Sequence, residues 1–174
     1  VERVSYPVIT PSSARGILEA IFWKPEIRYQ VQAIGVLKMG KETVILRNEL
    51  ASRQGSKPLI IEEQRMQRSS IVLKDVAYLI RAKIVLRSWV AGTVYKYRDQ
   101  FNRRVEKGQC YHRPYLGTRE FAAFFAPVNE GEQPLLLNME LGNMLFDIAF
   151  VEDAQRPEME FWRHGPGGAR RVWG

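Results

Sequence analysis

The sequence predicts an α+β fold with a mostly antiparallel sheet, for which a ferredoxin-like core with extra strands is the natural candidate. Two stretches, near positions 15 and 100, space their apolar residues as helices do. Segments in which apolar and polar residues alternate lie between these helices and after them. At 174 residues the chain is long enough for one substantial domain. No window reaches the length of a transmembrane span, and no signal peptide is visible.

The first helix is expected to follow Thr10, which suits an N-cap, with Pro11 at the first helical position. Its apolar stripe consists of Ala14, Ile17, Leu18, Ile21 and Phe22. The helix should stop at Trp23–Lys24, because a proline follows at position 25. Core packing is favoured for both aromatic residues at this end.

Strands are expected over residues 4–9, 27–33, 44–46, 59–61, 71–86, 116–128 and 144–150. A turn is expected at 129–134, where glycine, asparagine and proline gather. We therefore expect a core over 1–128 and a C-terminal β extension with a basic, glycine-rich tail over 129–174. The tail around residues 164–171 is expected to be a mobile basic loop rather than a phosphate cradle.

The strongest functional signal lies between residues 95 and 121. This window holds seven Lys and Arg, four Tyr and one of only two His. It should open as a helix, with Tyr97, Phe101 and Val105 on one apolar face and Gly108 at its end. The whole chain carries a net charge of +7. Such a basic bias favours nucleic acid or another polyanion as partner.

The main features of this window each have a second interpretation. The basic face has two interpretations, a merely solvated surface and a surface that binds nucleic acid. Tyrosines favour single strands slightly because bases stack on them, but Tyr97 shares the apolar stripe and could simply be buried. For His112, a general acid–base role competes with a plain hydrogen-bonding role. Cys110 is more consistent with a small core residue than with a nucleophile.

Other site classes find little support. The chain has neither a GxGxxG after a strand nor a GxxxxGK[ST] motif, which argues against dehydrogenases and ATPases. His112 and His164 lie far apart without metal-ligand spacing, so neither a metal nor another cofactor is expected. A single cysteine excludes a disulfide framework and makes a reducing cytoplasm the expected location.

Several strings together resemble one family. They are VERVSYPVITPSSARGILEAIFWKP (1–25), ILRNE (45–49), IIEEQRMQR (60–68), DVAYLIRA (75–82) and RRVEKGQCYHRPYLGTREF (103–121). In this order they resemble the CRISPR-associated Cas-five proteins of the d subtype, found in type I-C systems. The resemblance implies a RAMP protein, with a ferredoxin-like (RRM-type) domain and an extended C-terminal β region. Family members begin with one further strand, so a first strand is expected to be missing upstream of Val1.

The resemblance also implies an activity. Members of the d subtype cut precursor CRISPR RNA at the base of the repeat hairpin without a metal. The 2′-hydroxyl beside the scissile phosphate attacks it, which leaves a 2′,3′-cyclic phosphate and a 5′-hydroxyl. The protein then holds the 5′ handle of the guide RNA in a surveillance complex with other subunits.

In the family, a Tyr at the end of the first helix and a Lys–His pair before the second carry the chemistry. Here Phe22 stands at the position of that Tyr. Lys96 matches the Lys and would stabilise the phosphorane, whereas Tyr97 stands where the His often is. Proton transfer would then fall to Tyr97, Tyr111 or His112.

Phosphate contacts are expected from Lys24, Arg65, Arg68, Arg98, Arg103, Arg104, Lys107, Arg113 and Arg119. On composition alone, Arg65 and Arg68 also read as loop charges paired with Glu62 and Glu63. Two rival functions remain: an RNA-binding subunit that has lost cleavage, suggested by Phe22 and Tyr97, and additional binding of double-stranded DNA.

Overall fold

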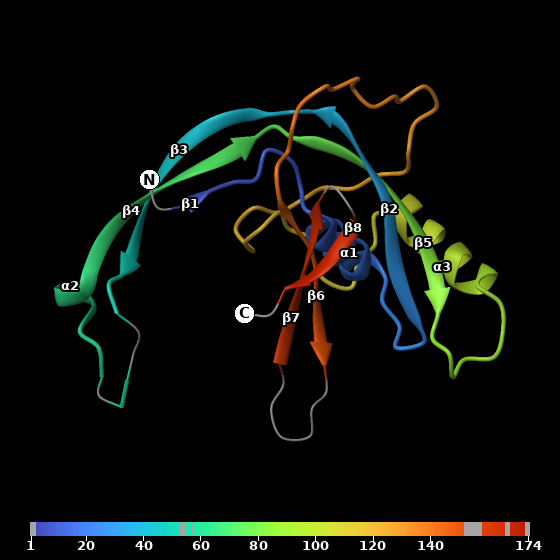
Figure 1. The fold of residues 1–174 in the computed structure, drawn as a ribbon, viewed down its shortest axis with the longest axis horizontal. Coiled ribbons are helices and arrows are strands. Elements are labelled where there is room, and N and C mark those ends of the chain that lie inside the picture. Colours follow the sequence, from blue (N-terminus) through green and yellow to red (C-terminus); the bar gives the residue numbers. More distant parts are fainter. Residues whose placement is uncertain (1–2, 53–54, 57, 152–157, 166–167, 173–174) are drawn as a thin grey trace. The chain divides into compact units, whose positions relative to one another are not determined.

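The computed structural model describes residues 3–52, 55–56, 58–151, 158–165 and 168–172 (Figure 1). The chain forms two compact units. The first comprises Val1–Val8 and Lys38–Ala77, and the second comprises Ile9–Leu37 and Tyr78–Gly174. No helix in the described part of the chain is long and apolar enough to cross a membrane.

The first unit is a three-stranded sheet in the order β1–β4–β3. Its elements are β1 (Arg3–Val4), β3 (Lys41–Leu50), the short helix α2 (Ile61–Gln64) and β4 (Arg65–Lys74). β3 and β4 are antiparallel in one unbroken register from Lys41↔Lys74 to Leu50↔Arg65, whereas β1 runs parallel to β4.

Three predictions for this region were wrong. Residues 59–61 form no strand but lead into α2. The single strand expected over 71–86 is two, because the chain turns at Asp75, whose φ of 61° is a left-handed conformation that aspartate tolerates better than most residues. Arg65 and Arg68 lie in β4 rather than in a loop, and Arg68 pairs with Glu49.

The second unit holds the two long helices. Its elements are α1 (Pro11–Ile21), most of β2 (Ile27–Lys38) and β5 (Ala77–Leu86), α3 (Tyr95–Glu106), β6 (Met144–Val151), β7 (Glu158–Gly165) and β8 (Gly168–Val172). β2 and β5 form a two-stranded sheet, and β6–β7–β8 form an antiparallel one. The glycine-rich tail is therefore a hairpin where it is described, with Gly165 opposite Gly168, and its assignment as a loop was wrong.

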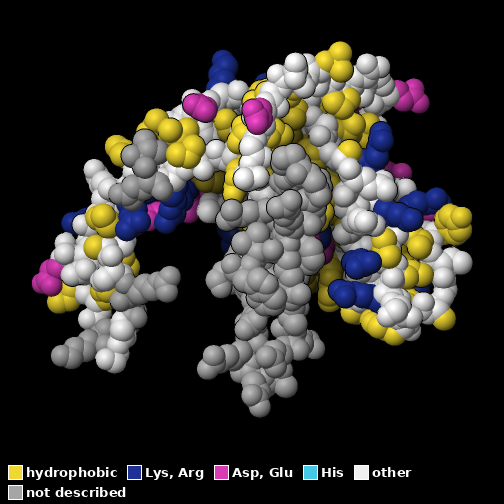
Figure 2. Space-filling view, viewed as in Figure 1, with side chains coloured by type: hydrophobic (Ala, Val, Ile, Leu, Met, Phe, Trp, Pro, Cys, Tyr) yellow, Lys and Arg dark blue, Asp and Glu magenta, His cyan; other side chains and the backbone are white. Residues whose placement is uncertain are grey.

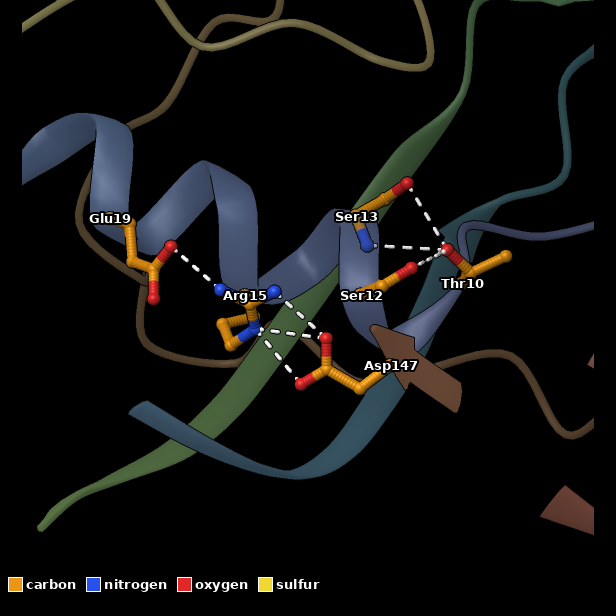
Figure 3. Close-up of polar contacts among 6 residues, drawn as sticks. All are labelled: Thr10, Ser12, Ser13, Arg15, Glu19 and Asp147. Atoms are coloured by element: carbon orange, nitrogen blue, oxygen red, sulfur yellow. Dashed lines mark hydrogen bonds and ion pairs between the residues drawn. The ribbon is translucent and has the colours of Figure 1, made fainter. Parts of the chain in front are cut away.

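The predicted start of α1 is confirmed. Thr10 is the N-cap, and its hydroxyl oxygen accepts a hydrogen bond from the Ser13 backbone N–H at 3.2 Å (Figure 3). The helix ends at Ile21, with Phe22 already extended, slightly before the predicted end. The prediction for α3 is confirmed at both ends. The helix begins at Tyr95 and ends at Glu106, and Gly108 just beyond it adopts a left-handed φ of 62°.

The core of the second unit lies between these helices and one face of β2 and β5. Its buried members are Ile17, Leu18, Ile21, Phe22, Ile27, Tyr29 and Tyr97. Ile80, Ala82, Ile84 and Leu86 of β5 pack against it, as their alternation predicts, together with Phe101 and Val105 of α3. Burial of this apolar surface provides the main force that holds α1 and α3 in place.

An arginine links α1 to β6. The Arg15 guanidinium donates to both carboxylate oxygens of Asp147, at 2.8 Å for the shortest bond, and to Glu19 at 2.8 Å (Figure 3). Burial lowers the pKa of Arg15, but these two carboxylates outweigh it and raise the pKa overall. The ion pair thus joins segments that are 132 residues apart in the sequence.

Residues 107–143 form a long connection. The strand expected over 116–128 was wrong, because the chain turns back between Leu116 and Phe121, which share a backbone hydrogen bond of 2.8 Å. An isolated bridge pairs Tyr115 with Ala122. The turn predicted at 129–134 is confirmed by the hydrogen bond from Glu132 N–H to the Asn129 carbonyl.

The α+β class and the antiparallel sheets are confirmed. A ferredoxin-like arrangement of these strands stays a prediction. The division into residues 1–128 and 129–174 also stays a prediction.

Candidate nucleic-acid interface

Lys and Arg side chains gather over the region of α3 (Figure 2, right). Lys96, Arg98, Arg103 and Lys107 are exposed, as predicted for a basic face. The Arg98 guanidinium lies 5.0 Å from the centre of the Tyr95 ring and donates to Asp99. Such a face can neutralise a phosphate backbone without reading its sequence.

At the N-terminal end of α3, Lys96 is exposed and its neighbour Tyr97 is buried. The ammonium nitrogen of Lys96 lies 4.7 Å from the centre of the Tyr97 ring. Tyr97 itself is only 4% exposed and belongs to the core. Of the two interpretations open for Tyr97, the structure supports packing.

At the C-terminal end of α3, the chain returns to the end of α1. The Ala20 carbonyl accepts hydrogen bonds from the backbone N–H groups of Tyr111, at 2.9 Å, and His112, at 3.2 Å. The last carbonyls of a helix lack partners within it and carry the negative end of its dipole, so they readily accept such bonds. The segment that carries Tyr111 and His112 is thereby fixed to α1.

The side chains of this segment point outward. Tyr111 is 81% exposed, and its ring meets that of His112 edge-on, with centres 5.8 Å apart. The next residues are anchored too, since Pro114 is fully buried and its carbonyl accepts from the Ala123 N–H at 2.8 Å. Two side chains able to move protons are therefore displayed on a fixed backbone.

The end of α1 is held by two further residues that the sequence analysis did not assign to it. The Ile21 carbonyl accepts from the Arg104 guanidinium at 3.1 Å, and the Phe22 carbonyl accepts from the Tyr29 hydroxyl at 2.7 Å. Burial raises the pKa of Tyr29 well above its ordinary value; the negative charge of Glu19 adds to this, and Arg104 opposes it. Tyr29 therefore keeps the proton that it donates.

The two aromatic residues after α1 differ from each other. Phe22 is 2% exposed, so its predicted core packing is confirmed, and the Arg104 guanidinium lies 5.4 Å from its ring centre. Trp23 is 53% exposed, and its predicted core packing was wrong. Lys24, next in the chain, is exposed as well.

The predicted phosphate-binding residues are divided between the two units. Arg65 is exposed at the start of β4 in the first unit. Arg68 is half-buried there, with its Nε atom 3.5 Å from Glu49, which also binds Arg3 at 2.9 Å. The exposed Arg113 and Arg119 lie in the second unit, where the Arg113 guanidinium is 5.1 Å from the Phe124 ring centre. No group of three or more His, Cys, Asp or Glu suited to a metal occurs among the described residues.

Comparison with known proteins identifies the family of this chain. Residues 1–144 match the family model described as CRISPR-associated protein (Cas_Cas5), of the Cas5d type. The chain is 60% identical to the CRISPR pre-crRNA endoribonuclease Cas5d of Thermus thermophilus, over 96% of this chain and 73% of that protein. It is 42% identical to the Cas5d endoribonuclease of Mannheimia succiniciproducens, over 86% of this chain and 77% of that protein.

Two solved structures share the fold. A functionally uncharacterized protein from Streptococcus mutans superposes with a TM-score of 0.64 at 18% identity, over 98% of this chain and 82% of that one. A CRISPR-associated protein superposes with a TM-score of 0.60 at 22% identity, over 93% of this chain and 78% of that one. On the family match and the two close relatives, the chain belongs to the Cas5d family of CRISPR-associated proteins.

Proposed function

We propose that this chain is an endoribonuclease that cuts precursor CRISPR RNA at the base of the repeat hairpin. Two relatives, 60% and 42% identical, are named for cutting this RNA. The exposed basic face of α3 suits a phosphate backbone. As part of the same proposal, the protein has a ferredoxin-like RAMP core, works in the cytoplasm, and keeps the 5′ handle in a complex with other subunits.

The proposed reaction uses the RNA's own nucleophile. A base removes the proton of the 2′-hydroxyl, the 2′-oxygen bonds to phosphorus, and the bond from phosphorus to the 5′-oxygen breaks. An acid protonates that leaving oxygen, which gives a 2′,3′-cyclic phosphate and a 5′-hydroxyl. A cation stabilises the charge of the intermediate phosphorane.

The observation that carries this proposal is the exposed pair Tyr111 and His112 on a backbone fixed to Ala20. General acids and bases must come within hydrogen-bonding reach of the reacting oxygens, and these side chains are accessible to RNA. We assign the proton transfers to His112 and Tyr111, and the adjacent Arg113 supplies positive charge. Tyr97, which is buried, has no part in them.

Lys96 offers a second source of positive charge. Lys96 lies in the first turn of the 12-residue helix α3, whereas His112 lies beyond the C-terminal end of this helix. The axial distance from Lys96 to Glu106 is about 15 Å at the rise of an α-helix. We place the proton transfers at the end that carries His112, and Lys96 is the alternative centre to be tested.

The test is incubation of the purified protein with labelled CRISPR repeat RNA in excess EDTA. The proposal predicts one cut at the hairpin base, with a cyclic phosphate on the upstream product. A duplex DNA of equal length serves as competitor, because binding driven by charge alone would not distinguish this DNA from the RNA hairpin. No cleavage under any condition that permits tight RNA binding would contradict the proposed enzyme.

That negative result would favour the second candidate, an RNA-binding subunit without cleavage. Its specific support is that Phe22 has no hydroxyl and that Tyr97 is buried, so neither matches the family pattern in chemistry. Tight binding of the intact hairpin in the same experiment is its expected outcome. Competition by duplex DNA at equal concentration would add DNA binding to either candidate.

A further inference from the structure

We propose that Arg104 is a positioning residue and not a phosphate contact. It fixes the C-terminal end of α1, and through that end it holds the backbone that carries Tyr111 and His112. The cleavage readout of this inference rests on the proposed function, whereas its structural readout does not. Its origin is the set of contacts that three successive carbonyl groups make at the end of α1.

These carbonyls are bound from three different segments. The Ala20 carbonyl accepts from the backbone N–H groups of Tyr111 and His112, and the Ile21 carbonyl accepts from Arg104 of α3. The Phe22 carbonyl accepts from Tyr29 of β2. The end of α1 is therefore a junction at which α3, β2 and the Tyr111–His112 segment meet.

Arg104 differs from its neighbour in the helix. Arg103 is exposed, whereas Arg104 is half-buried and its guanidinium is used on two sides. One side donates to the Ile21 carbonyl at 3.1 Å, and the planar group lies 5.4 Å from the centre of the Phe22 ring. A charge-assisted hydrogen bond and a cation–π contact together account for an arginine at this position.

An arginine at this position also matches the charge of the site. The C-terminal end of a helix carries partial negative charge, which a cation stabilises. Loss of the guanidinium would leave the Ile21 carbonyl without this donor, and an unpaired buried carbonyl destabilises its surroundings. Because Ala20 is in the same last turn, fraying there would release the N–H groups of Tyr111 and His112 as well.

The direct test is hydrogen exchange of the Tyr111 and His112 amides. In Arg104→Gln we expect both amides to exchange about tenfold faster than in the wild type, because their acceptor is no longer held. Arg103→Gln, the same change one residue earlier, should leave this protection unchanged. Unchanged protection in Arg104→Gln would overturn the proposal, whether or not the protein cuts RNA.

RNA binding provides the second readout. Arg103 is expected to bind a phosphate, so Arg103→Gln should make the dependence of log K on log salt shallower by about one. For Arg104→Gln we expect the wild-type slope, together with a cleavage rate at saturating protein that is lower by about tenfold. A shallower slope in Arg104→Gln with an unchanged saturating rate would instead identify Arg104 as a phosphate-binding residue.

Arg104→Lys covers the case in which the glutamine variant does not fold. Lysine keeps the charge and one donor for the Ile21 carbonyl but cannot stack a planar group on Phe22. Its amide protection should fall between those of the wild type and Arg104→Gln. Wild-type exchange of the Tyr111 and His112 amides in Arg104→Lys would contradict a positioning role that depends on the planar guanidinium.

Discussion

The two ends of α3 use similar residues in opposite ways. At the N-terminal end, Lys96 is exposed and its aromatic neighbour Tyr97 is buried. At the C-terminal end, Arg104 is half-buried against α1, and Tyr111 and His112 just beyond the helix are exposed. A basic residue beside an aromatic one therefore predicts no role by itself, because the role depends on which of the two lies in the core.

The two ends of α3 therefore expose different chemical groups, a cation at one end and groups that can transfer protons at the other. The N-terminal end presents a cation to solvent but keeps its tyrosine in the core. The C-terminal end uses its arginine for structure and presents the groups that can gain and lose protons. The comparison can be broken by changing one residue at each end and measuring the cleavage rate and the free energy of unfolding.

The largest effect is expected from His112→Ala. Removal of a general acid or base lowers a rate by about 100-fold or more. We therefore expect a loss of this size in the single-turnover cleavage of repeat RNA at saturating protein. Asn102→Ala, an exposed change in α3, is the control for expression and folding. A rate within twofold of wild type would remove His112 from the reaction. Proton transfer could then no longer be assigned to His112 at the C-terminal end of α3.

Lys96→Ala tests the other end, with an expected loss of about tenfold, because one of several cations near the RNA is removed. The measurement is again the single-turnover rate at saturating protein, compared directly with His112→Ala. A larger loss in Lys96→Ala than in His112→Ala would move the reaction centre to the N-terminal end of α3. A full rate would exclude Lys96 from the mechanism.

Much of the second unit follows from local sequence. The Thr10–Pro11 pair specifies the start of α1, and the spacing of Tyr97, Phe101 and Val105 specifies the buried face of α3. The alternation from Ile80 to Leu86 also identifies the face of β5 that packs on the core. These signals lie within one element, so sequence reasoning can find them.

The junction at the end of α1 depends on distant residues and escapes such reasoning. Arg104 meets Ile21 across 83 positions of sequence. One signal was nevertheless present: Arg104 follows Tyr97 by seven residues and so lies on the apolar stripe of α3. A charged residue on a buried stripe suggests a structural partner. The turn at Asp75, by contrast, needed a backbone conformation that alternation in residues 71–86 does not reveal.

A second half-buried arginine of this unit, Arg15, extends the comparison to α1. We expect Arg15→Met to lower the free energy of unfolding by about 2 kcal/mol, because it removes charge-assisted hydrogen bonds to Asp147 and Glu19 that are partly shielded from water. Urea denaturation measures this change. Arg98→Met, which removes an exposed pair with Asp99, is the matched control and should change stability by less than about 0.5 kcal/mol. Equal losses of stability in Arg15→Met and Arg98→Met would show that partial burial does not make the ion pairs of Arg15 stronger than the exposed pair of Arg98.

The smallest effect is expected from Tyr29→Phe, and it depends on pH. Loss of the hydrogen bond to the Phe22 carbonyl should lower the free energy of unfolding by about 1 kcal/mol at neutral pH. The pKa of Tyr29 is raised above its ordinary value of 10.0, so the folded chain binds this proton more tightly than the unfolded chain. Its stabilising contribution is complete below pH 10.0 and is lost as the pH rises through the folded pKa.

Urea denaturation at pH 7 and above pH 10 should therefore show wild type losing more stability with rising pH than Tyr29→Phe does. Tyr95→Phe, which changes an exposed tyrosine, is the control for titration of the other groups. If Tyr29→Phe loses stability above pH 10 as steeply as wild type, Tyr29 is not held protonated by the junction. The end of α1 would then be held by Arg104 and the Tyr111–His112 backbone, and the contrast between the two ends of α3 would rest on those contacts.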